Sequence, residues 1–439
     1  MNGSAHAGGP AETNWSGNYR YGAQAIVRPE SVEEIQEAVV AADHLRALGT
    51  RHTFNDIADS VGELLVLADL PDRFDLDAAS GTVTVGAAMR YGDIAARLQA
   101  SGWALGNLAS LPHISVAGAV ATGTHGSGDR NGTLAAAVAG LEIVDGSGNL
   151  IALRRGDPDF DGAVVSLGAL GIATAVTLDI VPTFYVRQNV YLELPWQRVL
   201  EDFDAITSAA YSVSLFTDWS GHAVEQVWLK RRVGASGAPE AADAPGAYPV
   251  ASASRAEDFF GARAATEPVH MLPGISAVNC TQQLGVAGPW HERLPHFRLA
   301  FTPSNGEEIQ SEYLMSRKHA AAAIEAVRPL AALLAPVLQI TEIRTMAGDN
   351  LWLSEANGHD TVAFHFTWRR DQAGVEAVLP ALESALAPFG ARPHWGKVFL
   401  DEAGVVPSLY PRMSDFRGLV GRYDPRGVFG NAYLERLLS

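Results

Sequence analysis

Two glycine-rich segments constrain most strongly what this chain can fold into. Residues 118–128 read Gly-Ala-Val-Ala-Thr-Gly-Thr-His-Gly-Ser-Gly, and residues 49–54 read Gly-Thr-Arg-His-Thr-Phe. Because glycine adopts positive φ without strain, the N–H groups of such loops can converge on phosphate oxygens. One such loop more often only builds a turn, whereas two in one domain could cradle a dinucleotide pyrophosphate; both interpretations stay open at this point. Neither segment fits the Walker or the Rossmann pattern.

Composition limits the partners of the chain. The 439 residues include 32 basic and 49 acidic side chains, so the net charge is 32 − 49 = −17. An acidic surface disfavours nucleic acid and anionic membranes and leaves small neutral substrates open. The single cysteine, Cys280, excludes an internal disulfide, a cysteine-rich zinc site and an iron–sulfur cluster. Residues 1–12 lack the pattern of a signal peptide, and no apolar run is long enough to span a bilayer, so we expect a cytoplasmic protein and, lacking an obvious interface helix, a monomer.

The length favours two domains, and hydrophobic periodicity predicts an α+β fold in which helices alternate with strands and hairpins. We expect a disordered tail over residues 1–12, a first domain over 13–182, a second domain over 183–395 and a C-terminal segment, 396–439, that returns to the first domain. A surface loop is expected between residues 234 and 253, where small residues and prolines dominate. The expected helices span residues 32–45, 91–100, 196–210, 316–338 and 375–388. The expected strands span residues 24–28, 64–70, 82–89, 172–181, 212–216, 226–230, 339–345 and 361–368, with a hairpin over 141–153.

Polar side chains share one face on each of two predicted strands. Side chains alternate with period two, so Glu342 and Arg344 project to one side, as do His365 and Thr367. If the two strands lie in one sheet, these groups form a single patch that Lys397 could reach from the domain junction. The alternative, from the residues alone, is a salt bridge on a half-exposed strand.

Four histidines raise the question of a metal site. His52, His113, His125 and His365 have no zincin spacing, and no acidic partner lies beside them at helical spacing. We therefore expect no metal.

The sequence resembles the alditol (xylitol) oxidase family, within the vanillyl-alcohol oxidase superfamily of FAD-linked oxidases. The resemblance is carried by residues 49–58, 111–128 and 339–368, including the long motif Leu-Pro-His-Ile-Ser-Val-Ala-Gly over residues 111–118, and extends from about residue 15 to residue 438. It implies a two-domain FAD-binding fold whose α+β substrate domain is built on an antiparallel sheet. It also implies transfer of a hydride from the C1 alcohol of a polyol, such as xylitol or sorbitol, to flavin N5, with dioxygen then forming hydrogen peroxide and the polyol leaving as an aldose.

The resemblance also implies the cofactor contacts. His52 matches the residue that bonds covalently to the 8α-methyl group of the flavin. Arg51 stands where we expect glycine in many relatives, and Thr53 where serine is common; Arg51 either alters the local backbone or places a positive charge near the pyrophosphate. The full set of expected cofactor-binding residues is Gly49, Thr50, Arg51, His52, Thr53, Phe54, Ser115, Gly118, Gly123, Ser127, Gly128 and Ile172.

The expected substrate contacts, also by resemblance, are Ser115, Glu342, Arg344, His365, Thr367 and Lys397. Arg344 and Lys397 would stabilise developing alkoxide charge, and Glu342 would hold Arg344 and accept hydroxyl hydrogen bonds. Lys397 could accept the substrate proton if burial lowers its pKa, but the catalytic base stays unassigned. An aldonolactone oxidase or dehydrogenase on the same fold is the nearest alternative function. A flavin-free carbohydrate-binding protein and a metal-dependent hydrolase are more remote.

Overall fold

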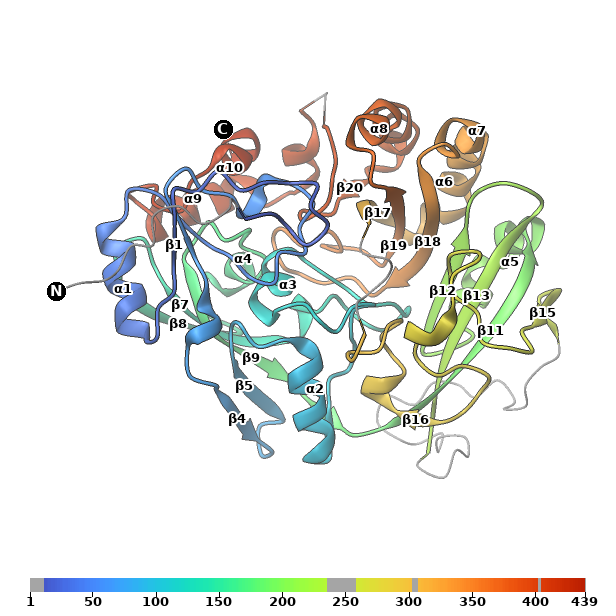
Figure 1. Ribbon diagram of the computed structural model, residues 1–439, viewed down its shortest axis with the longest axis horizontal. Helices are drawn as coiled ribbons and strands as arrows, with labels where there is room; N and C mark the ends of the chain where they lie inside the picture. The colour runs from blue at the N-terminus through green and yellow to red at the C-terminus, as the bar shows by residue number, and fades with distance from the viewer. Residues whose placement is uncertain (1–11, 235–257, 302–306, 402–403, 439) are drawn as a thin grey trace.

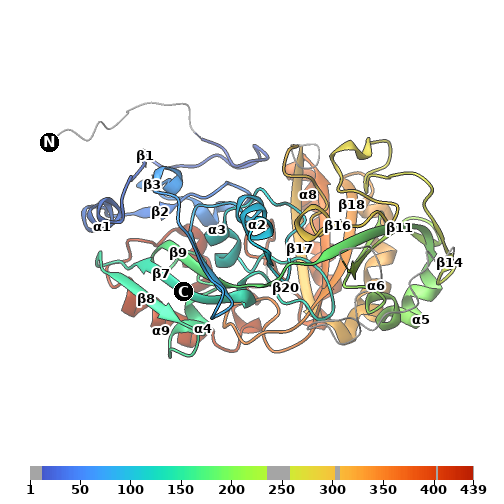
Figure 2. The same ribbon diagram turned by 90° about the horizontal axis from the view of Figure 1, so that it is seen from below.

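The computed structural model describes residues 12–234, 258–301, 307–401 and 404–438. Figures 1 and 2 show an elongated molecule with two lobes, one carrying the N-terminal elements and the other the middle of the chain. The tail expected over residues 1–12, apart from Glu12, and nearly all of the loop expected over residues 234–253 lie outside the described residues. No helix in the described ranges has the length and apolar character needed to cross a membrane.

A small parallel sheet begins the first lobe. It has the order β1 (Ala25–Val27), β3 (Glu63–Leu65), β2 (Leu45–Ala47), and α1 (Val32–Ala41) packs beside it. The helix predicted over residues 32–45 was too long. Ala42 already has extended backbone, and Leu45, whose side chain is fully buried, is the first residue of β2. Pairing with β3 and burial outweigh the helical periodicity there. The strand predicted over residues 64–70 likewise ends at Leu65.

The second sheet of the first lobe is antiparallel and five-stranded. Its order is β4 (Phe74–Asp77), β5 (Thr82–Gly86), β9 (Ile172–Asp179), β7 (Val138–Val144), β8 (Leu150–Arg154). β7 and β8 form the predicted hairpin around the Asp-Gly-Ser-Gly turn. Helices α2 (Tyr91–Ala100), α3 (Val116–Ala121) and α4 (Phe160–Ala163) and the short pair β6 (Trp103–Ala104) and β10 (Val181–Pro182) complete the lobe. The predicted bounds of α2 are confirmed.

The second lobe is built on one large antiparallel sheet. In spatial order its strands are β14 (Asp258–Phe259), β15 (Ala262–Ala264), β11 (Tyr185–Pro195), β13 (Ala223–Val233), β12 (Ser212–Thr217), β18 (Leu338–Met346), β19 (Thr361–Arg369), β17 (Glu308–Ser316) and β20 (Arg392–Pro393), and β16 (Gly288–Pro289) pairs with β11. One face of the sheet is covered by helices α5 (Trp196–Thr207), α6 (Ala320–Val327) and α8 (Gln372–Leu386) (Figure 1). Apolar side chains of these helices pack there with Phe364 and Phe366 of β19. The two strands with the polar faces are β18 and β19, and they are direct neighbours in this sheet, which meets the condition for a single polar patch.

The long helix predicted over residues 316–338 does not form. The segment divides into α6, a 3₁₀ turn over Arg328–Leu330 and the short α7 (Ala331–Leu334). Pro329 contributes to the break, since proline has no N–H to continue the helical hydrogen bonding, although the preceding Arg328 keeps helical backbone.

The end of the chain packs against the first lobe. Helices α9 (Met413–Tyr423) and α10 (Ala432–Leu438) share a hydrophobic core with residues of β5, α2, β7 and β9. Figure 1 shows both helices in red on the side of the molecule that carries α1 and β7. Buried Arg46 reinforces this packing by donating to the carbonyls of Phe429, at 2.8 Å, and Leu167, at 2.7 Å.

Candidate active site

A cavity of about 340 Å³ joins the two lobes. All six residues of the loop 49–54 line it, and so do Ser115 and Gly118 from the second glycine-rich segment. The opposite wall is the face of the large sheet that the helices leave uncovered, and it contributes Glu342, Arg344 and their polar neighbours. The two glycine-rich segments and the polar strand face therefore belong to one site.

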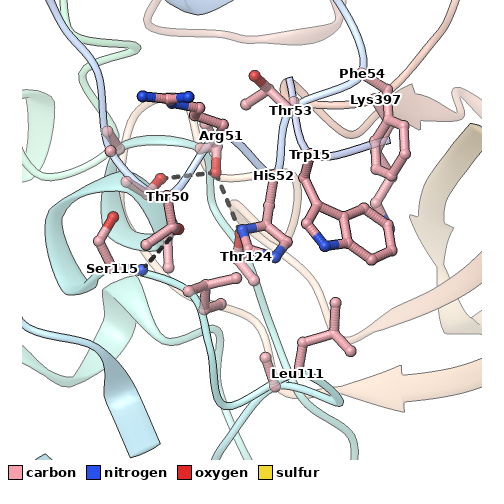
Figure 3. Close-up of a pocket in the computed structure, with 18 of the residues that line it drawn as sticks. Trp15, Thr50, Arg51, His52, Thr53, Phe54, Leu111, Ser115, Thr124 and Lys397 are labelled. Carbon is pink, nitrogen blue, oxygen red and sulfur yellow. Dashed lines mark hydrogen bonds between the residues drawn. The ribbon is translucent and has the colours of Figure 1, made fainter. Parts of the chain in front are cut away.

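His52 is the most unusual side chain of the loop. Both of its ring nitrogens are buried, and within the described chain the Thr50 backbone is the one group that approaches a ring nitrogen, without ideal hydrogen-bond geometry. The ring stacks on Trp15 with 5.4 Å between centroids, and Figure 3 shows Thr50 on the other side of the imidazole. Burial and the neighbouring His113 lower the pKa of His52 from 6.5 to about 4, with the Thr50 backbone acting in the opposite direction. The imidazole is therefore neutral at physiological pH and keeps a free lone pair.

The glycines at the start of each segment allow the two loops to pack closely. A Cβ atom at Gly49 would lie 2.6 Å from the Ser115 hydroxyl, and one at Gly118 would lie 2.9 Å from it. The Ser115 N–H donates to the Thr50 hydroxyl at 3.1 Å, which ties the segments together (Figure 3). Ser115 thus lies in the wall formed by the two loops.

Arg51 has a left-handed backbone conformation, with φ of 64°, and its guanidinium pairs with Glu12. Non-glycine residues adopt this conformation at a cost of about 1 kcal/mol or more. The left-handed conformation explains why glycine would suit the position. The ion pair with Glu12 shows that the Arg51 charge points toward the N-terminal segment.

Comparing two substitutions separates the backbone strain from the ion pair. Arg51→Ala and Arg51→Gly both remove the pair, but only glycine relieves the left-handed conformation. We expect Arg51→Gly to be more stable than Arg51→Ala by about 1 kcal/mol, measured by denaturant unfolding. Equal stabilities would show that Arg51 is not strained.

Four of the residues expected to bind the cofactor do not line the cavity: Gly123, Ser127, Gly128 and Ile172. The Ser127 hydroxyl lies 2.5 Å from that of Ser212, and the Gly128 N–H donates to the Thr345 carbonyl at 2.8 Å. These contacts anchor the loop to the large sheet. A Cβ atom at Gly123 would collide with Glu355, and Ile172 is buried in a hydrophobic core.

The five polar side chains expected to contact substrate on the sheet side and at the domain junction all line the cavity: Glu342, Arg344, His365, Thr367 and Lys397. Glu342 on β18 lies directly opposite His365 on β19, and its carboxylate is 3.6 Å from the Arg344 guanidinium. Phe364 and Phe366 face the helices, as the alternation predicts.

Glu312, on β17, lies at the centre of this polar cluster. It was not among the site residues predicted from the sequence. Its carboxylate accepts from Lys397 at 2.6 Å and from Arg344 at 3.2 Å, and His125 Nε2 is 3.2 Å away. Burial alone would raise the pKa of Glu312, but Lys397, His125 and Arg344 hold it well below its usual value. The available signal was the alternation of Glu308, Gln310 and Glu312 along a strand.

Lys397 and Arg344 fix the protonation of His365. Lys397 Nζ is 2.7 Å from His365 Nδ1, and an Arg344 nitrogen is 3.5 Å from the same atom. Arg344 can only donate, so Nδ1 serves as the acceptor and the proton of the neutral ring is on Nε2. Burial and Lys397 lower the pKa of His365 to about 4, and burial also lowers the pKa of Lys397 against the opposing effect of Glu312.

A serine that precedes Ser115 by five residues also reaches the polar cluster. Arg344 donates to the Ser110 hydroxyl at 3.0 Å, and Ser110 lines the cavity. Ser110 immediately precedes the motif at residues 111–118, whereas Ser115 lies within it. The sequence around the two serines does not indicate which of them contacts Arg344.

Beside Glu342, a further histidine that was not predicted from the sequence also lines the cavity. His296 Nε2 is 2.9 Å from Glu342 Oε1, and burial followed by Lys230 lowers the pKa of His296 from 6.5 to about 4. The neutral ring is therefore the form that the fold accommodates.

This shift predicts a pH-dependent contribution to stability. The folded-state pKa of His296 lies below its unfolded value, so its contribution is complete above about pH 6.5 and is lost as pH falls toward about 4. The difference in free energy of unfolding between the wild type and His296→Gln should therefore shrink over this interval, by an amount on the order of 3 kcal/mol at full protonation. Calorimetry of both proteins across this range measures the difference, and a gap independent of pH would contradict the assignment.

Comparisons with known proteins agree with this geometry. The family described as "FAD binding domain" matches residues 23–154, and the family described as "D-arabinono-1,4-lactone oxidase" matches residues 303–437. An alditol oxidase from a Streptomyces species is 48% identical over 432 residues, which cover 98% of this chain and 99% of that protein.

The chain belongs to the alditol oxidase family.

This membership confirms the resemblance inferred from the motifs. A second relative of this chain is the L-gulono-1,4-lactone dehydrogenase of Mycobacterium tuberculosis. The two sequences are 28% identical, and the match covers 98% of this chain and 99% of the relative. The crystal structure of cholesterol oxidase from B. sterolicum matches with a TM-score of 0.75 at 15% identity, covering 98% of this chain and 96% of that one. That likeness concerns the fold alone and confirms the predicted α+β class. Among the described residues, no set of three or more His, Cys, Asp and Glu side chains is placed to hold a metal ion.

Proposed function

We propose that the chain is an FAD-dependent oxidase of small neutral polyols, such as xylitol or sorbitol, that yields an aldose and hydrogen peroxide. One observation carries the proposal: a single cavity joins two glycine-rich loops, a buried imidazole that keeps a free nitrogen and a buried polar cluster suited to hydroxyl groups. The similarity to an alditol oxidase over nearly the whole chain supports the same substrate class.

The residues of the first lobe fit FAD. Gly49 and Gly118 keep the cavity wall free of side chains, and loop 49–54 lines the cavity along its whole length. His52 would hold the cofactor covalently, because its neutral ring presents a buried nitrogen with no partner within the described chain. When bound, FAD supplies the acceptor for the hydride and passes the electrons to dioxygen.

The polar cluster would activate the alcohol. Lys397 uses two N–H groups, one toward Glu312 and one toward His365. A neutral amine has only two N–H groups, so its lone pair remains to accept the hydroxyl proton of the substrate without breaking either contact. Burial lowers the pKa of Lys397, which makes this neutral form more accessible than it is for an exposed lysine. Once protonated, Lys397 would stabilise the alkoxide together with Arg344.

The same cavity is proposed to select for several hydroxyls. Glu342, Thr367 and Ser110 present acceptors and donors that an analogue lacking hydroxyls would leave unpaired. We therefore assign substrate binding to Glu342, Arg344, His365, Thr367 and Lys397, with Ser110 in addition.

The domain arrangement follows as a proposal. Residues 13–182 and 396–439 would form the FAD-binding domain, and residues 183–395 the substrate domain. This division is supported by the shared hydrophobic core of the first lobe with α9 and α10.

The test of the function is a substrate screen on purified protein. Peroxide release on xylitol or sorbitol under air is expected, together with a visible flavin absorption band. An aldonolactone oxidase or dehydrogenase is the second candidate, since the C-terminal match and one relative carry lactone names. Turnover of aldonolactones without turnover of polyols, under air or with an artificial electron acceptor, would favour that alternative.

A further inference from the structure

A row of three buried polar side chains runs from the cavity into the large sheet. Glu342 and His296 both line the cavity and contact each other, and Lys230 on β13 lies behind His296. His296 Nε2 is 2.9 Å from Glu342 Oε1, and Lys230 Nζ is 2.9 Å from His296 Nδ1. Lys230 does not line the cavity, and its side chain is among the largest that are fully buried. A lysine in such a place needs an explanation, because burying an ammonium is costly.

The surroundings of Lys230 specify the direction of each hydrogen bond. Lys230 donates to the carbonyl of Leu294 and, at 3.4 Å, to that of Pro295. An ammonium has three donors and no acceptor, so its third N–H is directed to His296 Nδ1. The single proton of neutral His296 is then on Nε2, where it donates to Glu342 Oε1.

The electrostatic environment supports the carboxylate form of Glu342 and the neutral form of His296. Burial lowers the pKa of Lys230 to about 7, while Glu342 raises it, Arg344 lowers it and Cys280 raises it. Burial would raise the pKa of Glu342, but Arg344 and His296 hold it well below its usual value. Near neutral pH, Glu342 is therefore a carboxylate and His296 a neutral imidazole, and Lys230 is an ammonium at pH values below about 7.

We propose that Lys230 and His296 are positioning residues for polyol recognition: Lys230 keeps His296 neutral with its proton on Nε2, and His296 saturates one oxygen of Glu342 so that the other accepts substrate hydroxyls. The role for substrate rests on the proposed function. The hydrogen-bond arrangement stands independently of it, because the three side chains and their distances define it.

The wild-type protein tests the arrangement directly. Protein labelled with ¹⁵N in its histidine rings is examined by NMR, and the His296 signals are identified by their loss in His296→Gln. The expected spectrum at neutral pH is that of a neutral ring protonated on Nε2. A ring protonated on Nδ1, or an imidazolium, would overturn the proposal. This measurement needs neither turnover nor a change at Lys230.

The variant Lys230→Met tests the role of the lysine, with Lys318→Met at an exposed position as the matched control. Without the neighbouring ammonium, His296 should take up its second proton at a higher pH than in the wild type. Weaker hydroxyl binding by Glu342 should raise KM for xylitol about tenfold, with kcat changed much less. The control should match the wild type in both respects.

A role that is only structural gives different results. In that case Lys230→Met lowers Tm while the titration of His296 and KM stay as in the wild type, and the proposal is wrong. Lys230→Gln, which keeps a donor without the charge, provides the same comparison if the methionine variant does not fold. Failure of the wild type to oxidise any polyol would instead refute the proposed function, and the NMR results would still decide the hydrogen-bond arrangement.

Discussion

Replacing His52 by alanine is expected to abolish covalent attachment of the flavin. In the wild type, the buried imidazole is neutral and only the Thr50 backbone approaches it within the described chain, which leaves a nitrogen available for the bond. Acid precipitation should leave the yellow colour in the wild-type pellet and release it from the His52→Ala pellet. Intact mass spectrometry should show the added mass of FAD only in the wild type.

His44→Ala is the control for this experiment. His44 is an exposed histidine eight positions earlier in the chain, so its replacement should leave the colour in the pellet. Retention of acid-stable flavin in His52→Ala would assign the covalent link to another residue. Colourless wild-type pellets from a yellow protein would show that the cofactor is held without a covalent bond.

The second large effect is expected for Lys397→Met. The variant removes the proposed proton acceptor and one of the two cations beside the alkoxide, while the methionine keeps similar bulk. We expect kcat/KM for polyols to fall by at least about 10²–10³-fold, the usual loss for one preorganised electrostatic group. Anaerobic stopped-flow measurement of flavin reduction isolates this step from the reaction with oxygen.

The pH dependence distinguishes the two roles of Lys397. Its pKa is lowered by burial, so the neutral form becomes populated as pH rises, and the wild-type reduction rate should increase through that pKa. Lys397→Met should lack this rising limb, and Lys318→Met should retain it. Reduction of the flavin in Lys397→Met at close to the wild-type rate would rule out both roles.

The parts of the fold that follow local rules could be predicted from the sequence. The bounds of α2, the β7–β8 hairpin and the strands β18 and β19 follow from periodicity and turn residues. The helix expected over residues 316–338 failed at Pro329, a signal that was present but given too little weight. β2 could not be predicted in this way, because its pairing with β3 and the burial of Leu45 are tertiary effects.

The same distinction between local patterns and tertiary contacts applies to the site. Alternation placed Glu342, Arg344, His365 and Thr367 on faces that do line one cavity. His296 and Lys230 meet across 66 positions of the sequence, and no local pattern connects them. Ser127 and Gly128 belong to a conspicuous loop motif, yet their contacts in the structure are with Ser212 and Thr345 rather than with the cavity. Motif composition indicated the loop but not which of its residues face the ligand.

The most direct test of the account is the visible spectrum of purified wild-type protein during anaerobic addition of xylitol. Our proposal predicts a flavin band that is bleached by the polyol and restored by air, with the release of one hydrogen peroxide for each reoxidised flavin. A protein that binds no flavin when expressed with excess riboflavin, or a bound flavin that no polyol bleaches, would contradict it.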